Sequence, residues 1–259
     1  MMDKLKVALI QSEIVWENAE QNRINFSAVI NSIKEDVDLV VLPELFSTGF
    51  SMNPEPIAES MEGKTVKWMQ ALASKKQSAI TGSIVTKVDN NYYNRLLFVH
   101  PSGEINIYDK KHTFTFAGED KAFASGTKKL IVDYNGWKIC PLVCYDLRFP
   151  VWSRNVEDYD VLLYTANWPT PRMIAWKSLL KARAIENMCY CIGVNRVGSD
   201  NLGNEFSGHS RAYDVMGEKI STIQPNKEQI EVVVLDKNHI ISNREKFQFL
   251  NDRDSFTLK

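Results

Sequence analysis

The sequence predicts an α+β fold: a four-layer α-β-β-α sandwich of two stacked mixed sheets, related by a pseudo-twofold internal repeat. Three observations predict it. Four segments of the first half recur in the same order in the second half. The first three segments of each half are apolar almost throughout, which is typical of strands covered on both faces. Each half has too few helices to cover both faces of a sheet, so we expect the two sheets to cover each other.

The internal repeat has the same order of elements in each half. Each half reads as strand, helix, strand, helix and strand, followed by a hairpin that turns at a glycine. The spacing between matched segments varies, because loop lengths are free to differ. The matched ranges are 5–13 with 137–146, 37–44 with 159–167, 78–85 with 189–197, and 94–110 with 209–223.

Segments between the strands have the apolar spacing of amphipathic helices. In the first of them Ile24 and Ile30 fall near one face, and in the last Leu180 and Ile185 do so. We expect these faces to pack on the sheets. The helical segments are residues 17–34, 63–76 and 174–188.

The composition is that of a globular chain with a large core. Of 259 residues, 44% are hydrophobic, and 31 basic side chains are balanced by 32 acidic ones. No block of lysine or arginine favours nucleic acid or a membrane as a partner, so we expect a small-molecule ligand. We expect a single domain over residues 1–259, with residues 236–259 as a C-terminal arm that packs on the body or on a partner subunit.

The apolar segments also bear on cellular location. The amino-terminal apolar run is too short for the core of a signal peptide, and no small-residue cleavage site follows it. No segment approaches the roughly 18 uninterrupted apolar residues of a membrane span. We therefore expect a cytoplasmic protein.

The cysteines occur in two close pairs, residues 140 and 144 in the stretch KICPLVCYDLRFP and residues 189 and 191 in CYC. This pattern is unlike a disulfide framework. Zinc is a weaker alternative, because neither pair has the two-residue spacer of a zinc knuckle and both lie in strand-like sequence. We expect no metal. Cys140 lies within the apolar run and is predicted to be a core residue, whereas Cys144 lies where the strand ends and backbone N–H groups become free.

Reactive side chains follow three of the predicted strands. Glu44 ends one strand, the adjacent Lys110 and Lys111 follow the hairpin strand INIYD, and Cys144 ends the strand KICPLV. Ligands of such sheets bind beyond the carboxyl ends of the strands. A carboxylate can act as the base for a thiol nucleophile, and an ammonium group can stabilise an oxyanion. Each residue alone is most often a packing or surface residue, but together they make chemical sense as a site with an activated thiol nucleophile.

Three segments, LPELFSTGF, YDKKHTF and LVCYDLRFP, resemble the signature segments of the nitrilase, or carbon–nitrogen hydrolase, superfamily in their order and separation. The resemblance covers nearly the whole chain. It implies a catalytic Glu-Lys-Cys set at Glu44, Lys110 and Cys144, in which the lysine stands two residues before His112. It also implies an assisting carboxylate at Glu119. The sequence departs from the pattern where it has Thr113 in place of a leucine.

The segments CYDLRFPVWSRN, NWPTPR and FLNDRDSFTL are similar to those of bacterial omega-amidases. This resemblance implies hydrolysis of the distal amide of 2-oxo dicarboxylic acid monoamides, such as 2-oxoglutaramate and 2-oxosuccinamate. Another aliphatic amidase or an N-carbamoyl-amine hydrolase is the alternative. The superfamily also implies a homodimer, and its chemistry requires no cofactor.

In the implied reaction Cys144 forms a thioester, and its oxyanion is bound by Lys110 and the backbone N–H of Tyr145. Arg172 is a candidate for binding the substrate carboxylate, because it lies in a loop after a strand end. Trp168 and Phe116 are candidates for the pocket wall. A further arginine, residue 148, is expected to make a buried ion pair that shapes the turn after the cysteine.

Two other functions are alternatives to this one. The stretch GHSRA at residues 208–212 is close to a serine-hydrolase elbow, but that motif requires a strand before the serine and a helix after it. Here the following residues read as a strand and a turn. A non-catalytic binding module on the same scaffold would be favoured only if Glu44, Lys110 or Cys144 were missing.

Overall fold

The computed structural model describes residues 3–258 and confirms the predicted sandwich of two mixed sheets. The first is six-stranded in the order β13-β1-β2-β3-β4-β5, and the second is five-stranded in the order β12-β9-β8-β7-β6. The strands of the first sheet are β1 (Lys4–Gln11), β2 (Leu39–Val41), β3 (Ala79–Val88), β4 (Asn91–Val99), β5 (Ile105–Asp109) and β13 (Gln229–Asp236). Those of the second are β6 (Val132–Tyr134), β7 (Trp137–Val143), β8 (Val161–Ala166), β9 (Tyr190–Asn195) and β12 (Arg211–Tyr213). The strands β10 (Val197–Ser199) and β11 (Glu205–Ser207) form a separate ribbon.

The internal repeat is present in the strand pairing. β1, β2 and β3 are parallel neighbours and β4 is antiparallel to β3. In the second half β7, β8 and β9 are parallel neighbours and β12 is antiparallel to β9. The halves also exchange edge strands. β6, which follows the first half, pairs with β7, and β13, which follows the second half, pairs with β1.

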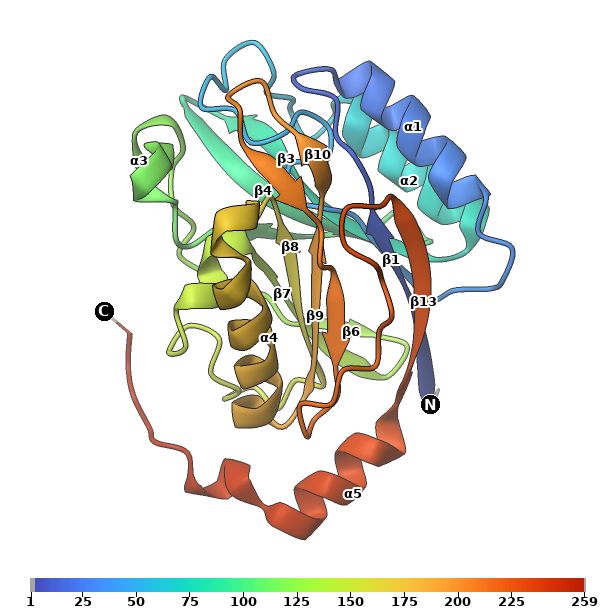
Figure 1. The fold of residues 1–259 in the computed structure, drawn as a ribbon, viewed down its shortest axis with the longest axis vertical. Helices are drawn as coiled ribbons and strands as arrows, with labels where there is room; N and C mark the ends of the chain where they lie inside the picture. Colours follow the sequence, from blue (N-terminus) through green and yellow to red (C-terminus); the bar gives the residue numbers. More distant parts are fainter. Residues whose placement is uncertain (1–2, 259) are drawn as a thin grey trace.

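Helices cover the two outer faces of the sandwich (Figure 1). Two of them, α1 (Ala19–Asn31) and α2 (Lys64–Lys76), lie on one side, and α4 (Met173–Asn187) lies on the other. These helices fall within the predicted segments or begin one residue outside them. The short helix α3 (Glu119–Ala122) and the 3₁₀ turns η1 (Thr115–Ala117), η2 (Cys144–Arg148) and η3 (Thr170–Arg172) lie in loops beyond strand ends.

Two expected core contacts of the helices are wrong. Ile24 is 56% exposed and Ile185 is 45% exposed. The buried face of α1 contains Phe26 and Ile30. Ile24 precedes Phe26 by two residues, which places it about 200° away around the helix. Ile185 follows the buried Ala184 by one residue and is turned about 100° from it.

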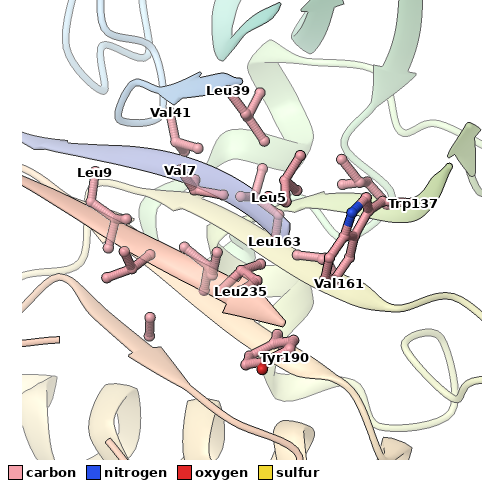
Figure 2. Close-up of a cluster of buried hydrophobic side chains, with 14 of the residues drawn as sticks. Leu5, Val7, Leu9, Leu39, Val41, Trp137, Val161, Leu163, Tyr190 and Leu235 are labelled. Atoms are coloured by element: carbon pink, nitrogen blue, oxygen red, sulfur yellow. The ribbon is translucent and has the colours of Figure 1, made fainter. Parts of the chain in front are cut away.

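The core lies in two kinds of layer, because side chains alternate across each strand. Leu5, Val7 and Leu9 of β1 point into the space between the sheets, where they join Val161 and Leu163 of β8 (Figure 2). Ala8 and Ile10 of β1 point the other way and join an outer cluster with α1 and α2. Each fully buried leucine of this kind contributes about 1.5–3 kcal/mol. The inter-sheet layer therefore fixes how the strand ends of one half face those of the other.

The C-terminal segment forms α5 (Lys237–Phe247) and the 3₁₀ turn η4 (Phe249–Asp252). α5 contacts the body of its own chain. Ile240 is buried in the inter-sheet cluster, and Arg244 donates hydrogen bonds to the carbonyls of Met188 and Tyr159. Among residues 3–258 no helix is long and apolar enough to cross a membrane.

Candidate active site

The three reactive residues predicted from strand ends lie together in the structure. Glu44 follows β2, Lys110 follows β5, and Cys144 follows β7. Lys110 Nζ lies 2.9 Å from Glu44 Oε1. The charges of Glu44 and Lys110 both act on the Cys144 thiol. The site therefore brings together side chains that are far apart in the sequence and that come from both sheets.

A second carboxylate completes the surroundings of Lys110. Glu119 of α3 accepts hydrogen bonds from Lys110 Nζ at 3.0 Å on Oε1 and 2.8 Å on Oε2. Asn94 Nδ2 donates to both carboxylates, at 2.8 Å to Glu44 and 3.2 Å to Glu119. All four side chains are buried. The ammonium group is therefore held between two carboxylates in a fixed position.

Glu44 is also tied to the opposite sheet. The backbone N–H of Asn167, directly after β8, donates to Glu44 Oε2 at 2.8 Å. The Asn167 side chain donates to the backbone carbonyl of Glu44 at 2.5 Å. Sequence reasoning did not single out Asn94 or Asn167 for this role, although Asn167 was recognised as a strand end.

Charge and burial act in opposite directions on Lys110. Burial alone would lower the pKa of Lys110, but the carboxylates of Glu119 and Glu44 outweigh it and raise the pKa. Burial raises the pKa of Glu119, and the ammonium of Lys110 opposes that rise. Lys110 is therefore a permanent cation at neutral pH, suited to bind negative charge and unsuited to act as a base.

Cys144 begins the 3₁₀ turn η2 with a backbone φ of +45°. This left-handed conformation is uncommon for a residue other than glycine and costs of order 1–3 kcal/mol, so surrounding contacts must hold it. The side chain turns out of the strand direction into the site, and the residue is 9% exposed. Cys140, in contrast, is fully buried within β7 as a core residue is, and only Cys144 of the two lines the pocket.

Asp146 holds the turn after Cys144. Its carboxylate is fully buried and accepts hydrogen bonds from Val143 N at 3.0 Å and from the Tyr108 hydroxyl at 2.8 Å. The backbone N–H of His112, at 3.0 Å, and His112 Nδ1, at 2.7 Å, also contact it. Asp146 thus connects the Cys144 turn to the loop that carries Lys110. An aspartate two residues after a strand-end cysteine was the available signal, and it was missed.

The surroundings of Cys144 favour the neutral thiol. Burial raises its pKa well above the ordinary value, the negative charge of Glu44 raises it further, and Lys110 opposes the rise. The resting residue is therefore a thiol, not a thiolate. A nucleophile of this kind must lose its proton to a base during attack.

Cys144 lies at a pocket whose walls include several aromatic residues. The four other residues predicted to contact substrate or oxyanion, Tyr145, Phe116, Trp168 and Arg172, all line this pocket. Phe116 is 86% exposed, which places it at the mouth. The remaining lining residues are Phe50, Phe114, Ala117, Arg148, Asn167, Pro169, Asp200, Asn204 and Phe206.

The two arginines of the pocket lie against aromatic rings. The guanidinium carbon of Arg172 is 5.1 Å from the centre of the Phe114 ring, and that of Arg148 is 5.1 Å from the Trp168 ring. The expected buried ion pair of Arg148 is wrong: the residue is exposed, and no carboxylate of residues 3–258 lies in ion-pair contact with it. Asp146 shapes the turn in its place, through hydrogen bonds.

The serine-hydrolase alternative does not match the local structure. Ser210 Oγ bonds the backbone N–H and carbonyl of Asn195, at 3.0 and 3.2 Å. The segment that follows Ser210 is the strand β12, where an elbow would require a helix. Ser210 therefore joins strands instead of presenting a nucleophile.

Comparison with known proteins identifies the family of this chain. A family model for carbon–nitrogen hydrolases matches residues 6–245. The chain belongs to the carbon–nitrogen hydrolase family. The crystal structure of a carbon–nitrogen hydrolase superfamily protein from Xanthomonas campestris superposes on this carbon–nitrogen hydrolase with a TM-score of 0.97, at 39% identity and over 100% of both chains. That protein carries an arsenic adduct in its active site.

Two curated relatives have stated activities. The omega-amidase YafV of Escherichia coli is 42% identical to this carbon–nitrogen hydrolase over 258 residues, which cover 99% of this chain and 100% of the relative. The 2-oxoglutaramate amidase of Bacillus subtilis is 33% identical over 219 residues, covering 83% and 84% of the two chains. The chain is thus an amidase of the carbon–nitrogen hydrolase family that acts on a small-molecule amide.

Proposed function

We propose that this carbon–nitrogen hydrolase is an omega-amidase. It releases ammonia from the distal amide of 2-oxo dicarboxylic acid monoamides, namely 2-oxoglutaramate and 2-oxosuccinamate. The observation that carries the proposal is one pocket that contains the Cys144 thiol beside a buried carboxylate and ammonium, together with Arg172. The activities of the Escherichia coli and Bacillus subtilis relatives support it.

In the first half of the reaction, Glu44 takes the thiol proton as Cys144 Sγ attacks the amide carbonyl carbon. The carbonyl π electrons move to oxygen, and Lys110 Nζ and the Tyr145 N–H stabilise that oxyanion. Each such donor contributes about 3 kcal/mol at typical oxyanion sites. When the oxyanion collapses, the C–N bond breaks and Glu44 gives its proton to the departing nitrogen. Ammonia and a thioester result.

In the second half, Glu44 removes a proton from the water that attacks the thioester carbon. The second tetrahedral intermediate uses the same oxyanion donors. Its collapse breaks the C–S bond, and the proton on Glu44 returns to sulfur. One carboxylate thus acts as base and acid in both halves. Glu119 contributes by holding Lys110 charged and in place.

Arg172 is the proposed partner of the substrate carboxylate. It lines the pocket that contains Cys144, and its guanidinium is oriented by the Phe114 ring. Trp168 donates its indole N–H to the backbone carbonyl of Arg172 at 2.9 Å, which fixes the loop. Phe116 and Trp168 form apolar walls around the substrate carbon chain.

We test this substrate assignment by ammonia release from 2-oxoglutaramate, 2-oxosuccinamate, butyramide, an N-carbamoyl amine and a nitrile. We expect the two 2-oxo acid amides to have the largest kcat/KM. Arg172→Ala should lower kcat/KM for them about ten- to a hundredfold, the range expected for a charge-assisted pair, and spare butyramide. Arg253→Ala, a change of a half-buried arginine that pairs with Asp158 outside the pocket, is the control. If wild type preferred butyramide, the carbamoyl amine or the nitrile, the omega-amidase assignment would be wrong and only membership of the carbon–nitrogen hydrolase family would stand.

The setting of the enzyme is also part of the proposal. We propose that residues 1–259 act as one catalytic domain, that the domain forms a homodimer, and that it works in the cytoplasm. The family match over residues 6–245 and the contacts of α5 with its own body support the single domain. The cycle proposed above needs no metal or cofactor, since every proton and electron pair moves between substrate, water and side chains.

A further inference from the structure

Two arginines of the catalytic pocket have no carboxylate partner in the part of the chain that the structure describes. Arg148 lies in η2, the turn that begins with Cys144, and Arg172 lies in η3 after β8. Within residues 3–258 neither makes an ion pair, and both contact aromatic rings of the pocket wall. The one acidic residue of the lining, Asp200, is used by its own loop: its carboxylate accepts from Leu202 N, Asn204 N and Asn204 Nδ2.

The two positive charges influence each other. Burial lowers the pKa of Arg172, the proximity of Arg148 lowers it further, and Cys144 opposes this. Like charges at close range destabilise a folded protein unless something compensates. Since the rest of the lining is largely apolar, the arrangement is suited to an anionic ligand that contacts both guanidiniums.

A 2-oxo acid has more acceptors than one arginine can pair. Its carboxylate and its 2-oxo group present three oxygens on two adjacent carbons. One guanidinium binds a carboxylate through two parallel N–H donors, which leaves the 2-oxo oxygen unpaired. A second guanidinium supplies the missing donor.

We propose that Arg148 is a specificity-determining residue that donates a hydrogen bond to the 2-oxo oxygen of the substrate while Arg172 binds the carboxylate. This inference rests on the proposed omega-amidase function. The same positive charge disfavours a 2-ammonium group at that position. Arg148 therefore separates 2-oxo acid amides from the corresponding amino acid amides, which differ only at this carbon.

The test uses four-carbon amides that differ in one group. 2-Oxosuccinamate has the 2-oxo group, succinamate has a methylene in its place, and asparagine has an ammonium. Steady-state kcat/KM is measured for wild type, Arg148→Met, Arg148→Lys and the control Arg253→Met, with butyramide as the uncharged reference. Arg148 is exposed, and a thermal melt of each variant checks that it remains folded.

We expect Arg148→Met to lower kcat/KM for 2-oxosuccinamate about tenfold or more, to change succinamate less than about threefold, and to leave asparagine unchanged or raised. The ratio of the 2-oxo to the amino substrate should therefore collapse. Arg148→Lys keeps the charge and should keep asparagine poor while recovering only part of the 2-oxosuccinamate rate.

The two proposals fail in different ways. If wild type prefers 2-oxosuccinamate and Arg148→Met retains the wild-type ratio of 2-oxosuccinamate to asparagine, the role of Arg148 is wrong and the omega-amidase function stands. Equal losses on 2-oxosuccinamate and succinamate would also overturn it, because Arg148 would then bind only the carboxylate. If wild type prefers butyramide, both proposals fall.

Discussion

The two halves of the chain match closely where their strands begin. The backbone N–H of Lys6 donates to Asp38 Oδ2 at 2.7 Å, and that of Lys138 donates to Asp160 Oδ2 at 2.9 Å. The reciprocal bonds, from the N–H of each aspartate to the carbonyl of each lysine, are 2.9 and 2.8 Å. A lysine backbone and an aspartate therefore join the first two parallel strands of each half, β1 to β2 in one sheet and β7 to β8 in the other.

The halves differ where their strands end. The residue after β1 that corresponds to Cys144 is Ser12, whose hydroxyl bonds Glu228 Oε1 at 2.5 Å and whose carbonyl accepts from Val197 N. Ser12 thus stays within the strand network, whereas Cys144 leaves it with a positive φ. From this comparison we expect changes at the strand starts to alter stability and changes at the strand ends to alter catalysis. The active site combines strand ends from both halves, because Glu44 follows a strand of the first half and Cys144 follows a strand of the second.

The largest effect should come from the end of β7. Cys144→Ala should abolish amide turnover, a loss of at least about 10⁴-fold, because no other group can form the thioester. Ser12→Ala, at the matching end of β1, and Cys140→Ala, within β7, should both retain most of the activity. Steady-state rates on folded proteins decide this. A dead Cys140→Ala with an active Cys144→Ala would invert the assignment of the nucleophile.

Glu44→Gln should lower turnover by about 10²- to 10⁴-fold and slow both thioester formation and thioester hydrolysis. It should also lower the pKa of Cys144, because the negative charge of Glu44 helps to raise that pKa. The thiolate should therefore appear at lower pH in the variant. Rapid-quench mass spectrometry follows the acyl-enzyme, and ultraviolet thiolate absorbance against pH, with the Cys144→Ala signal subtracted, follows the pKa. A full-speed acyl-enzyme burst would restrict Glu44 to the second half of the reaction.

Lys110→Ala should reduce kcat by about 10²- to 10³-fold through loss of an oxyanion donor, and it leaves two buried carboxylates without their cation. Lys111→Ala, the neighbouring change, should have little effect, since that side chain contacts the Trp152 ring outside the site. Both are measured as kcat, with circular dichroism as a check on folding. If both variants lost kcat equally, the assignment of Lys110 and not Lys111 as the oxyanion donor would be wrong.

The smallest effect on rate is expected at the strand starts. Asp160→Asn should lower the free energy of unfolding by about 1–3 kcal/mol and leave kcat/KM within about twofold of wild type. Asp38→Asn should cost less stability, because Asp160 also pairs with Lys237 and Arg244 of α5. Denaturant unfolding and steady-state kinetics test both. If either variant lost activity while its free energy of unfolding stayed constant, the proposed division of roles between strand starts and strand ends would be wrong.

The sequence was sufficient for the features that depend on periodicity and order. The repeat, the apolar strands and the positions of Glu44, Lys110 and Cys144 after strand ends all follow from patterns along the chain. The sequence was a poorer guide to which individual side chains are buried. Ile24 is apolar and lies in a helix, yet its direction depends on the angular centre of the buried face, which a loose apolar spacing does not define.

The polar residues that support the site were harder to predict than the reactive ones. Asp146 supports the site through hydrogen bonds with Tyr108 and His112, and Asn167 supports it through a hydrogen bond to Glu44. Each of these bonds crosses between elements far apart in sequence, so it depends on how the two sheets are stacked. Arg148 illustrates the same point, because its expected anionic partner does not lie beside it.

The exchange of edge strands affects how the protein is made. A ribosome completes β1 to β5 early, but the strand that covers the outer edge of β1 is β13, which pairs through Lys4 with Asp236. Until that late segment is synthesised, the first sheet has a long, apolar and unpaired edge. Such edges promote association between unfinished chains. Nascent chains that stop before residue 229 should therefore depend on chaperones, whereas a chain that contains β13 can cover this edge of β1.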